Sequence, residues 1–528
     1  MIWLDLFLLI LTCVTGAFVL RYNVHMFQLN GYKNREHLNR LKKSAGKQGI
    51  LFALPVFGIP GLFIKAVPVY IPVIILLLIT LRYYLYLREI NTKKKLVYTN
   101  RVKRLLVTEA LLSAAVLLCG WLLFERRFFL FSCTLSLVLQ ILLPVAGNLI
   151  NHPVESAINR HYIYDAKRIL GQNPDLVIIG ITGSYGKTSM KYYLNTLLSE
   201  HFDVLITPES FNTPMGVVRT IREHMTPRNE IFLCEMGARH VGDIRELCDL
   251  VHPKHGIITS VGPQHLETFF TIENVVNTKF ELADALPEDG MLILNGDNEL
   301  IREKGTEYRD PVYYSTEDRG GPGNPDETAG YRAEKIRLSR TGTEFTVVTP
   351  EGEEESFSMR LIGAHNVINV LGAITTAHKL GVPLRKLKTA VRRLLPVEHR
   401  MKMIPHGNYT IIDDAYNSNP AGSKAAVETL SMFEGQRILI TPGMVELGEK
   451  EEEFNYRFGT YAAACCDYVF LVGRKHTEPI LKGLTDSGFD TERAEVFDRI
   501  EDALSRAYNV KGEGHKYILL ENDLPDNY

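Results

Sequence analysis

Five apolar stretches in the first 150 residues, separated by short basic segments, constrain this chain more than any other feature of its sequence. Residues 2–20 are long enough to cross a bilayer as one helix. No Lys or Arg precedes Arg21, so we expect a retained span and not a secretory signal peptide. The other stretches are residues 50–64, 66–81, 105–124 and 128–150. The pattern predicts a helical transmembrane region over residues 1–150 with about five spans, although four prolines within residues 50–81 also fit a re-entrant hairpin.

The basic residues predict the orientation of these spans. Segment 21–48 holds seven Lys and Arg, and segment 82–104 holds eight. Short loops rich in Lys and Arg stay in the cytoplasm. Five spans satisfy both loops and leave everything after residue 150 in the cytoplasm, where ATP is available. We therefore expect a multi-pass protein of the plasma membrane, with the lipid bilayer as a partner and with spans that act as an anchor or help to handle substrate.

The charge balance divides the chain at the same point. Residues 1–150 carry 18 Lys and Arg against 5 Asp and Glu, whereas the remainder carries 41 against 56. An acidic soluble part would repel a polyanion, so we expect no nucleic-acid partner. The seven Cys form no CxxC pair, which argues against both a disulfide framework and a zinc ribbon.

The soluble part has the pattern of an α/β protein. After a linker-like stretch over 151–174, apolar strand-like runs alternate with helical segments, which predicts a doubly wound parallel sheet. The expected strands of this first unit are 176–182, 231–235, 256–260 and 291–294, and residues 316–330 are expected to form an exposed loop. The pattern restarts near 396–400, with strands at 411–413, 437–441 and 468–472 and helices near 421–433 and 451–465. We predict a P-loop domain over 151–395 and a Rossmann-like α/β domain over 396–528.

A glycine-rich turn joins the first of these strands to a helix that is expected from about Lys187 to Glu200. In this context backbone N–H groups and the helix N-terminus favour anionic oxygens. Lys187 is expected to reach the outer phosphates, and the Thr188 hydroxyl can ligate Mg²⁺. The turn departs from the strict GxxxxGK[ST] pattern because Ile181 takes the position of the first glycine. We predict nucleotide binding here.

Three further polar residues that come after this turn in the sequence are candidates for metal or phosphate chemistry. Glu235 ends a buried apolar strand and is placed to hold Mg²⁺, although a solvated strand-end carboxylate has the same pattern. His265 follows another strand end, where a lone histidine is more often structural. Lys279 lies on a helix and, taken alone, has the pattern of a surface charge.

Nine short motifs follow in order along residues 180–448. They are TGSYGKTS (182–189), NTPMG (212–216), EMGARHVGDI (235–244), TSVGPQHLE (259–267), TKFE (278–281), NGD (295–297), GAHNVIN (363–369), IIDDAYNSNP (411–420) and MVELG (444–448). This series resembles the Mur ligases, the ATP-dependent enzymes that add amino acids or a dipeptide to peptidoglycan precursors. The stretch D-D-x-Y-N-x-N-P favours the type that adds D-alanyl-D-alanine.

The resemblance implies which residues bind metal, act in catalysis, bind the nucleotide and bind the other substrates. Thr188 and Glu235 would hold one Mg²⁺, and His265 and Lys279 would serve a second, with Lys279 carbamylated. Lys187, His265 and Lys279 would be catalytic. The nucleotide would contact Gly183, Ser184, Gly186, Lys187, Thr188, Ser189, Asn366, Asn369, Arg400 and Asp414, and the other substrates would contact Asn212, Thr213, Tyr416, Asn417 and Asn419.

The resemblance also implies the reaction, an ADP-forming acid–amino-acid ligation through an acyl phosphate. ATP, Mg²⁺, a carboxylate-bearing wall precursor and an amine would take part. The membrane segment stands where the family has a soluble UDP-binding domain, so the precursor is either UDP-linked or membrane-borne. Two alternatives remain: a membrane-bound ligase for another polymer such as poly-γ-glutamate, and a P-loop membrane ATPase that makes no bond.

Overall fold

The structure of the protein is a computed structural model that describes residues 2–43, 78, 81–82, 85, 95–123, 133, 135–137, 139–209, 211–316, 330–416 and 418–523. The chain divides into two compact units, residues 1–161 and 162–524. The expected stretch 50–64 and most of 66–81 lie outside the described residues, as does most of the expected loop 316–330.

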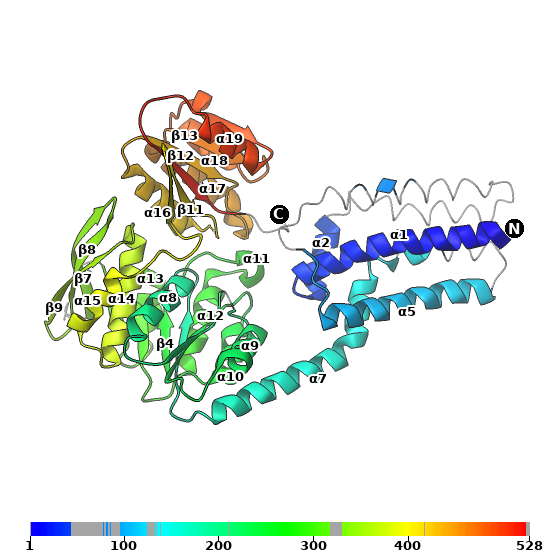
Figure 1. Cartoon of the computed structure of the whole chain (residues 1–528), viewed down its shortest axis with the longest axis horizontal. Helices are drawn as coiled ribbons and strands as arrows, with labels where there is room; N and C mark the ends of the chain where they lie inside the picture. Colours follow the sequence, from blue (N-terminus) through cyan, green and yellow to red (C-terminus); the bar gives the residue numbers. More distant parts are fainter. Residues whose placement is uncertain are drawn as a thin grey trace. The chain divides into compact units, whose positions relative to one another are not determined.

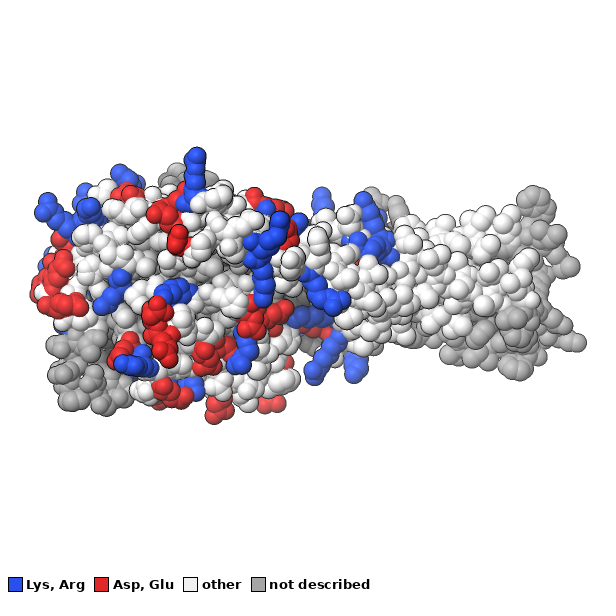
Figure 2. Space-filling view, turned by 90° about the horizontal axis from the view of Figure 1, so that it is seen from below, with Lys and Arg blue, Asp and Glu red and all other residues white. Residues whose placement is uncertain are grey.

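The first unit is helical in its described part. Its helices are α1 (Ile2–Leu29), α2 (Asn34–Lys43), α5 (Asn100–Leu123) and the beginning of α7 (Leu143–Gly171). Two segments, Leu9–Leu29 and Asn100–Leu122, are long and apolar enough to cross a membrane. Figure 2 shows a face on which these helices present mainly uncharged atoms, while side chains of both signs cover the α/β part. The residues expected to form a linker, 151–174, are instead largely helical because α7 continues to Gly171.

A nine-stranded sheet forms the first part of the second unit (Figure 1). The strand order is β2-β3-β1-β4-β5-β6-β7-β8-β9, parallel as far as β7 and antiparallel beyond it. The strands are β1 (Val177–Thr182), β2 (Val204–Ile206), β3 (Ile231–Glu235), β4 (His255–Ile258), β5 (Leu292–Asn295), β6 (Val312–Ser315), β7 (Gly330–Ser339), β8 (Gly342–Val348) and β9 (Glu354–Met359).

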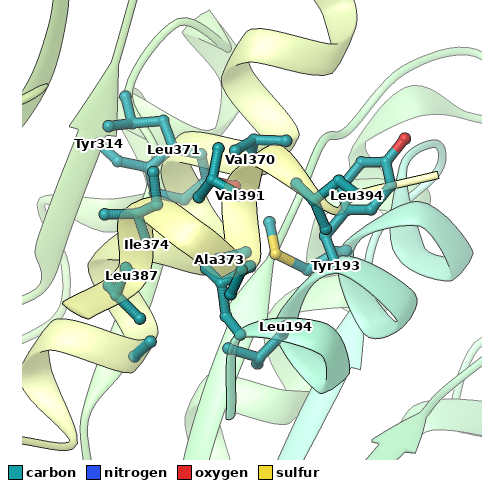
Figure 3. Packing of buried hydrophobic residues seen from close by; sticks show 14 of the residues in the cluster. Tyr193, Leu194, Tyr314, Val370, Leu371, Ala373, Ile374, Leu387, Val391 and Leu394 are labelled. Atoms are coloured by element: carbon teal, nitrogen blue, oxygen red, sulfur yellow. The ribbon is translucent and has the colours of Figure 1, made fainter. Parts of the chain in front are cut away.

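Helices cover both faces of this sheet because alternate residues of each central strand point to opposite sides. In β1, Ile179 and Ile181 join one hydrophobic cluster and Ile178 joins another. The first cluster includes residues of α8, α14 and α15, and Figure 3 shows side chains of α14 and α15 packed beside Tyr193 and Leu194 of α8. The helices are α8 (Lys187–Leu198), α9 (Pro214–His224), α10 (Asp243–Val251), α11 (Leu266–Phe269), α12 (Ile272–Asp284), α13 (Glu299–Gly305), α14 (Ala364–Lys379) and α15 (Leu384–Arg392).

A six-stranded sheet follows, in the order β10-β11-β15-β12-β13-β14. All its pairings are parallel except that of β10 with β11. The strands are β10 (Lys402–His406), β11 (Tyr409–Asp414), β12 (Gln436–Thr441), β13 (Tyr468–Val472), β14 (Ala494–Phe497) and β15 (Lys516–Glu521). The helices are α16 (Pro420–Ser431), α17 (Glu451–Cys465), α18 (Glu478–Asp486) and α19 (Ile500–Tyr508), with short 3₁₀ turns η1 (Gly448–Lys450) and η2 (Thr491–Arg493). The α/β prediction is thus confirmed for both parts.

Candidate active site

The glycine-rich turn between β1 and α8 is held tightly by the segment that follows β4. Gly183 has φ 150° and Gly186 has φ 81°, and a Cβ atom added to Gly183 would lie 2.2 Å from Oγ1 of Thr259. The Ser184 N–H donates to the carbonyl of Ser260 at 2.7 Å. A side chain at Gly183 would therefore displace the turn, which explains why glycine is needed at this close approach.

Lys187 begins α8 and folds back onto this turn. Its Nζ donates to the carbonyl oxygens of Gly183 at 2.5 Å and of Ser184 at 3.2 Å. Burial lowers the pKa of Lys187 to about 8, against the opposing effect of Glu235. A partly desolvated cation at the mouth of the turn would interact strongly with a phosphate oxygen.

Glu235, at the end of β3, is the carboxylate that contacts the residues following the glycine-rich turn. Its Oε1 accepts hydrogen bonds from the Thr188 hydroxyl and from the Asn212 amide, both at 3.1 Å. Its Oε2 lies 2.9 Å from Nζ of Lys191. Burial alone would raise the pKa of Glu235, but the charges of Lys191 and Lys187 hold it below its ordinary value. The carboxylate is therefore ionised beside the phosphate loop.

Lys191 is a residue of this cluster that the sequence analysis missed. Its side chain is fully buried, and Nζ also donates to the carbonyl of Glu209 at 2.5 Å. Burial lowers its pKa and the Glu235 charge opposes that shift. The signal was present in the sequence, because Lys191 lies four residues after Lys187 and so shares its helix face.

Lys279 of α12 is buried. Its position on a helix, taken alone, had predicted a surface charge, and that prediction is wrong. Burial and the nearby charge of Lys187 lower the pKa of Lys279 well below its ordinary value. Among the described residues no hydrogen bond or ion pair reaches its Nζ, and the aromatic ring of Phe269 lies 5.9 Å away. A buried amine in such surroundings favours the neutral form.

His265 immediately precedes α11 and has a left-handed backbone, with φ 53°. Its Nδ1 lies 2.5 Å from Oε2 of Glu446, which follows β12 in the second sheet. Burial lowers the pKa of His265, and the hydrogen bond to Glu446 opposes this shift.

Asn366 and Asn369, which were expected beside the adenine, lie on α14. The Oδ1 atom of Asn369 approaches the phosphate loop so closely that a Cβ atom on Gly186 would lie 2.6 Å from it. Asn366 is buried, accepts from the Tyr193 hydroxyl at 2.8 Å and donates to the carbonyl of Ile362 at 2.8 Å. The amide of Asn366 thus ties α14 to α8, and its role in binding adenine stays a prediction.

The C-terminal part contributes Arg400 and Asp414. The guanidinium of Arg400 lies 4.9 Å from the centre of the Tyr416 ring, and its charge lowers the pKa of Lys187. Asp414 accepts from the Met401 N–H at 3.2 Å, and burial raises its pKa to about 6 although Arg400 opposes the shift.

The other predicted binding residues lie at helix ends, within α8 or outside the described residues. Asn419 caps α16 by accepting from the Gly422 N–H at 2.8 Å. Thr213 directly precedes α9 and makes no side-chain cap bond. Ser189, which was expected to contact the nucleotide, is buried on α8. Asn417 lies outside the described residues. The roles of these residues in binding substrate are not tested by their positions.

The donor set around Thr188 and Glu235 fits Mg²⁺. Neighbouring ligand oxygens of an octahedral Mg²⁺ are about 3 Å apart, and the Thr188 Oγ1 to Glu235 Oε1 distance is 3.1 Å. Within the described ranges no group of three or more His, Cys, Asp or Glu side chains could hold a metal ion. A cation here would therefore rely on a small protein donor set together with phosphate oxygens and water, as Mg²⁺ commonly does.

Two family models match the chain. Residues 181–377 match the Mur ligase middle domain, and residues 399–520 match the Mur ligase glutamate ligase domain. The chain is 29% identical over 336 residues to the UDP-N-acetylmuramoyl-tripeptide–D-alanyl-D-alanine ligase of Escherichia coli, covering 62% of this chain and 73% of the relative. The Bacillus subtilis enzyme of the same name is 30% identical over 56% of this chain, which spans 63% of that enzyme.

A solved structure has the same fold. The crystal structure of the MurF ligase from Thermotoga maritima in complex with ADP superimposes with a TM-score of 0.60. The match covers 69% of this chain and 80% of that chain, at 24% sequence identity.

Proposed function

Since this chain belongs to the Mur ligase family, we propose that it uses ATP to join an amino acid or D-alanyl-D-alanine to a carboxylate of a peptidoglycan precursor. The observation that carries the proposal is the placement of Lys187, Thr188 and Glu235 at one glycine-rich turn, where Lys187 contacts the Gly183 carbonyl and the Thr188 hydroxyl donates to Glu235. A generic ATPase needs the turn, a lysine and an acid, but it has no use for a buried, unpaired second lysine.

The reaction must overcome the poor reactivity of a carboxylate, whose oxygen is a poor leaving group. A carboxylate oxygen attacks the γ-phosphorus of ATP and ADP leaves, which produces an acyl phosphate. The amine then attacks the acyl carbon, phosphate leaves, and the amine nitrogen loses a proton. Phosphoryl transfer of this kind depends on positioning and on neutralising charge.

The residues of the turn would bind and orient the nucleotide. Backbone N–H groups of 186–188 at the N-terminus of α8 would bind the phosphates. Lys187 would move from the backbone carbonyls to the outer phosphates, and Asn369 would border the nucleotide with Asn366 behind it. Arg400 and Asp414 would approach the nucleotide from the C-terminal part.

Mg²⁺ would supply charge neutralisation and a fixed orientation of the phosphates. Thr188 and Glu235 would hold one ion, and His265 and Lys279 would serve a second. A neutral, buried Lys279 amine can attack the carbon of CO₂ and release one proton to solvent, which leaves a carbamate with anionic oxygen donors. This modification explains how a lysine could serve a cation site.

The other two substrates would meet at the opposite side of the turn. Asn212 and Thr213 would contact the carboxylate substrate, and Tyr416, Asn417 and Asn419 would line the side from which the amine arrives. Closure of the C-terminal part would bring the amine to the acyl phosphate and exclude water.

We further propose that residues 1–150 span the plasma membrane several times and leave the catalytic part in the cytoplasm. Support comes from two helical segments, Leu9–Leu29 and Asn100–Leu122. α5 also exposes large apolar side chains, which are Val107, Leu111, Leu118, Trp121 and Leu122. Cys13 and Cys119 lie within these two segments, so the topology is tested at a cysteine introduced between segments, Lys95→Cys, by labelling in sealed vesicles with permeant and impermeant thiol reagents.

The decisive experiment supplies the full-length protein with ATP and Mg²⁺ and withholds each remaining substrate in turn. D-alanyl-D-alanine serves as the amine, with UDP-linked or lipid-linked muramyl tripeptide as the carboxylate. We expect phosphate release and an amide of the summed mass only when both are present. Rapid ATP turnover without either would instead favour a membrane ATPase, and turnover only with glutamate polymers would favour the other ligase class.

A further inference from the structure

Glu521 and Asn522, near the end of the described chain, take part in none of the steps above. Glu521 is the last residue of β15, which lies between β11 and β12 in the six-stranded sheet. The parallel register sets Glu521 opposite Asp414, the last residue of β11. Glu521 therefore lies at the carboxyl ends of the parallel strands, where the chain leaves β11.

The two residues connect two separate loops. The Ser418 hydroxyl donates to Oε1 of Glu521, and the Thr441 hydroxyl donates to Oε2 at 3.0 Å. Asn522 accepts from the Ser418 N–H at 3.1 Å and donates to the Gly443 carbonyl at 2.6 Å. Glu521 and Asn522 together thus fix Ser418 through both its backbone and its side chain, and they join it to the segment after β12.

Burial of the Glu521 carboxyl group is unfavourable, which indicates that this side chain does more than complete the sheet. The Glu521 side chain is only 1% exposed. Its surroundings make the uncharged form the stable one, since burial, and next the charge of Asp414, raise its pKa to about 8. Asn522 has a left-handed backbone with φ 68°, which asparagine tolerates better than most residues. Pairing within β15 requires only backbone groups, so these side chains act on the loops.

We propose that Glu521 and Asn522 are positioning residues that fix Ser418, and thereby place its neighbours Tyr416 and Asn419 to receive the incoming amine. The inference rests on the proposed function, because Tyr416 and Asn419 are assigned to the amine. Asp414, which is assigned to the nucleotide, has its own hydrogen bond from the Met401 N–H, and the ATP-binding turn lies on the other sheet, so a change at Glu521 should affect the amine more than the nucleotide.

The test measures steady-state kinetics of the full-length protein with D-alanyl-D-alanine as the varied substrate at pH 7. Glu521→Leu removes both hydrogen bonds at nearly constant volume, and we expect it to raise KM for the dipeptide about tenfold. Glu521→Gln retains an acceptor and a donor, so its KM should stay within about twofold of the unmodified protein. The dissociation constant for ADP should change by less than about twofold in both variants.

Two further variants keep the test decisive. Ser418→Ala removes one hydroxyl from the loop itself and should raise the same KM about threefold, which carries the test if Glu521→Leu fails to fold. Glu513→Gln, at an exposed position before β15, is the matched control and should be unchanged.

The outcomes separate two failures. If the unmodified protein makes no amide with any amine, the proposed function is wrong. If it makes the amide but Glu521→Leu leaves KM for the dipeptide unchanged, or shifts ADP binding equally, the positioning role is wrong. Loss of activity in Glu521→Gln as severe as in Glu521→Leu would also overturn it, because a required charge would then explain both.

Discussion

His265 and Glu446 form a hydrogen bond that joins the two parts of the α/β unit, with Nδ1 of the imidazole 2.5 Å from Oε2 of the carboxylate. Both residues have left-handed backbones, with φ 53° and 65°. Since Nδ1 is taken by Glu446, Nε2 is the ring nitrogen left for a ligand. Arg239 lies 3.8 Å from the other oxygen of Glu446 and gives this carboxylate a positively charged partner.

Glu446→Gln should weaken the use of Mg²⁺. The neutral amide no longer fixes the imidazole as firmly, and loss of such an outer partner typically costs 10–100-fold in metal affinity or activity. We expect the Mg²⁺ concentration for half-maximal activity to rise about tenfold. Glu449→Gln, at an exposed position one turn away, is the control. An unchanged Mg²⁺ dependence in Glu446→Gln would remove the orienting role.

Lys191→Met should destabilise the protein. It leaves the buried Glu235 carboxylate without its nearest cation, and breaking a buried pair in this way typically costs about 3–5 kcal/mol. The thermal unfolding midpoint should fall by several degrees. The double variant Lys191→Met with Glu235→Gln removes the unpaired charge and should recover more than half of the loss. A double variant no more stable than Lys191→Met would argue that lost packing, and not the charge, is the cause.

Lys279→Ala should lower the rate of amide formation about 100-fold or more, because the carbamate that serves the cation site can no longer form. Small carboxylates such as acetate or formate should restore part of the activity by supplying oxygen donors in the vacated space. The exposed Lys335→Ala is the matched control. Full activity in Lys279→Ala without any added carboxylate would exclude the second-metal role.

The pH dependence of stability should change in Glu521→Gln. The folded state retains the proton of Glu521 up to about pH 8, whereas an unfolded glutamate loses its proton near pH 4.3. The stability contributed by this proton is therefore complete below about pH 4 and is lost as the pH rises to 8, with a slope of at most about 1.4 kcal/mol per pH unit. The unfolding midpoint of the unmodified protein should fall between pH 5 and 8 relative to that of Glu521→Gln. Parallel curves for the two proteins would contradict the raised pKa.

Much of the α/β fold was predictable because its central strands are buried on both faces and appear as short apolar runs. Strands Ile231–Glu235 and Tyr468–Val472 and helix Glu451–Cys465 match their predicted bounds. β15 was not predicted. It inserts between β11 and β12 although it follows them by more than 70 residues, and such non-sequential pairing has no local signal. Residues 151–171 of α7 were predicted as part of a linker-like stretch, although the helix continues through them with Pro153 inside it.

The candidate site was predictable only in part, for a physical reason. The turn with Lys187 and Thr188 follows the end of β1, and Glu235 ends β3, so sequence alone indicates a common edge of the sheet. Glu446 and Glu521 become significant only through partners distant in sequence, which local patterns do not reveal. Whether the remaining predicted residues contact substrate stays a prediction.

Oxygen transfer tests the proposed ligation most directly. The precursor carboxylate is labelled with ¹⁸O and incubated with the full-length protein, ATP, Mg²⁺ and D-alanyl-D-alanine, and the released phosphate is analysed by mass. An acyl phosphate carries one carboxylate oxygen into the phosphate that the amine expels, so we expect one ¹⁸O per phosphate and one amide per ADP. Unlabelled phosphate released at the same rate would show that ATP is hydrolysed by water and that the turn does not serve a ligase.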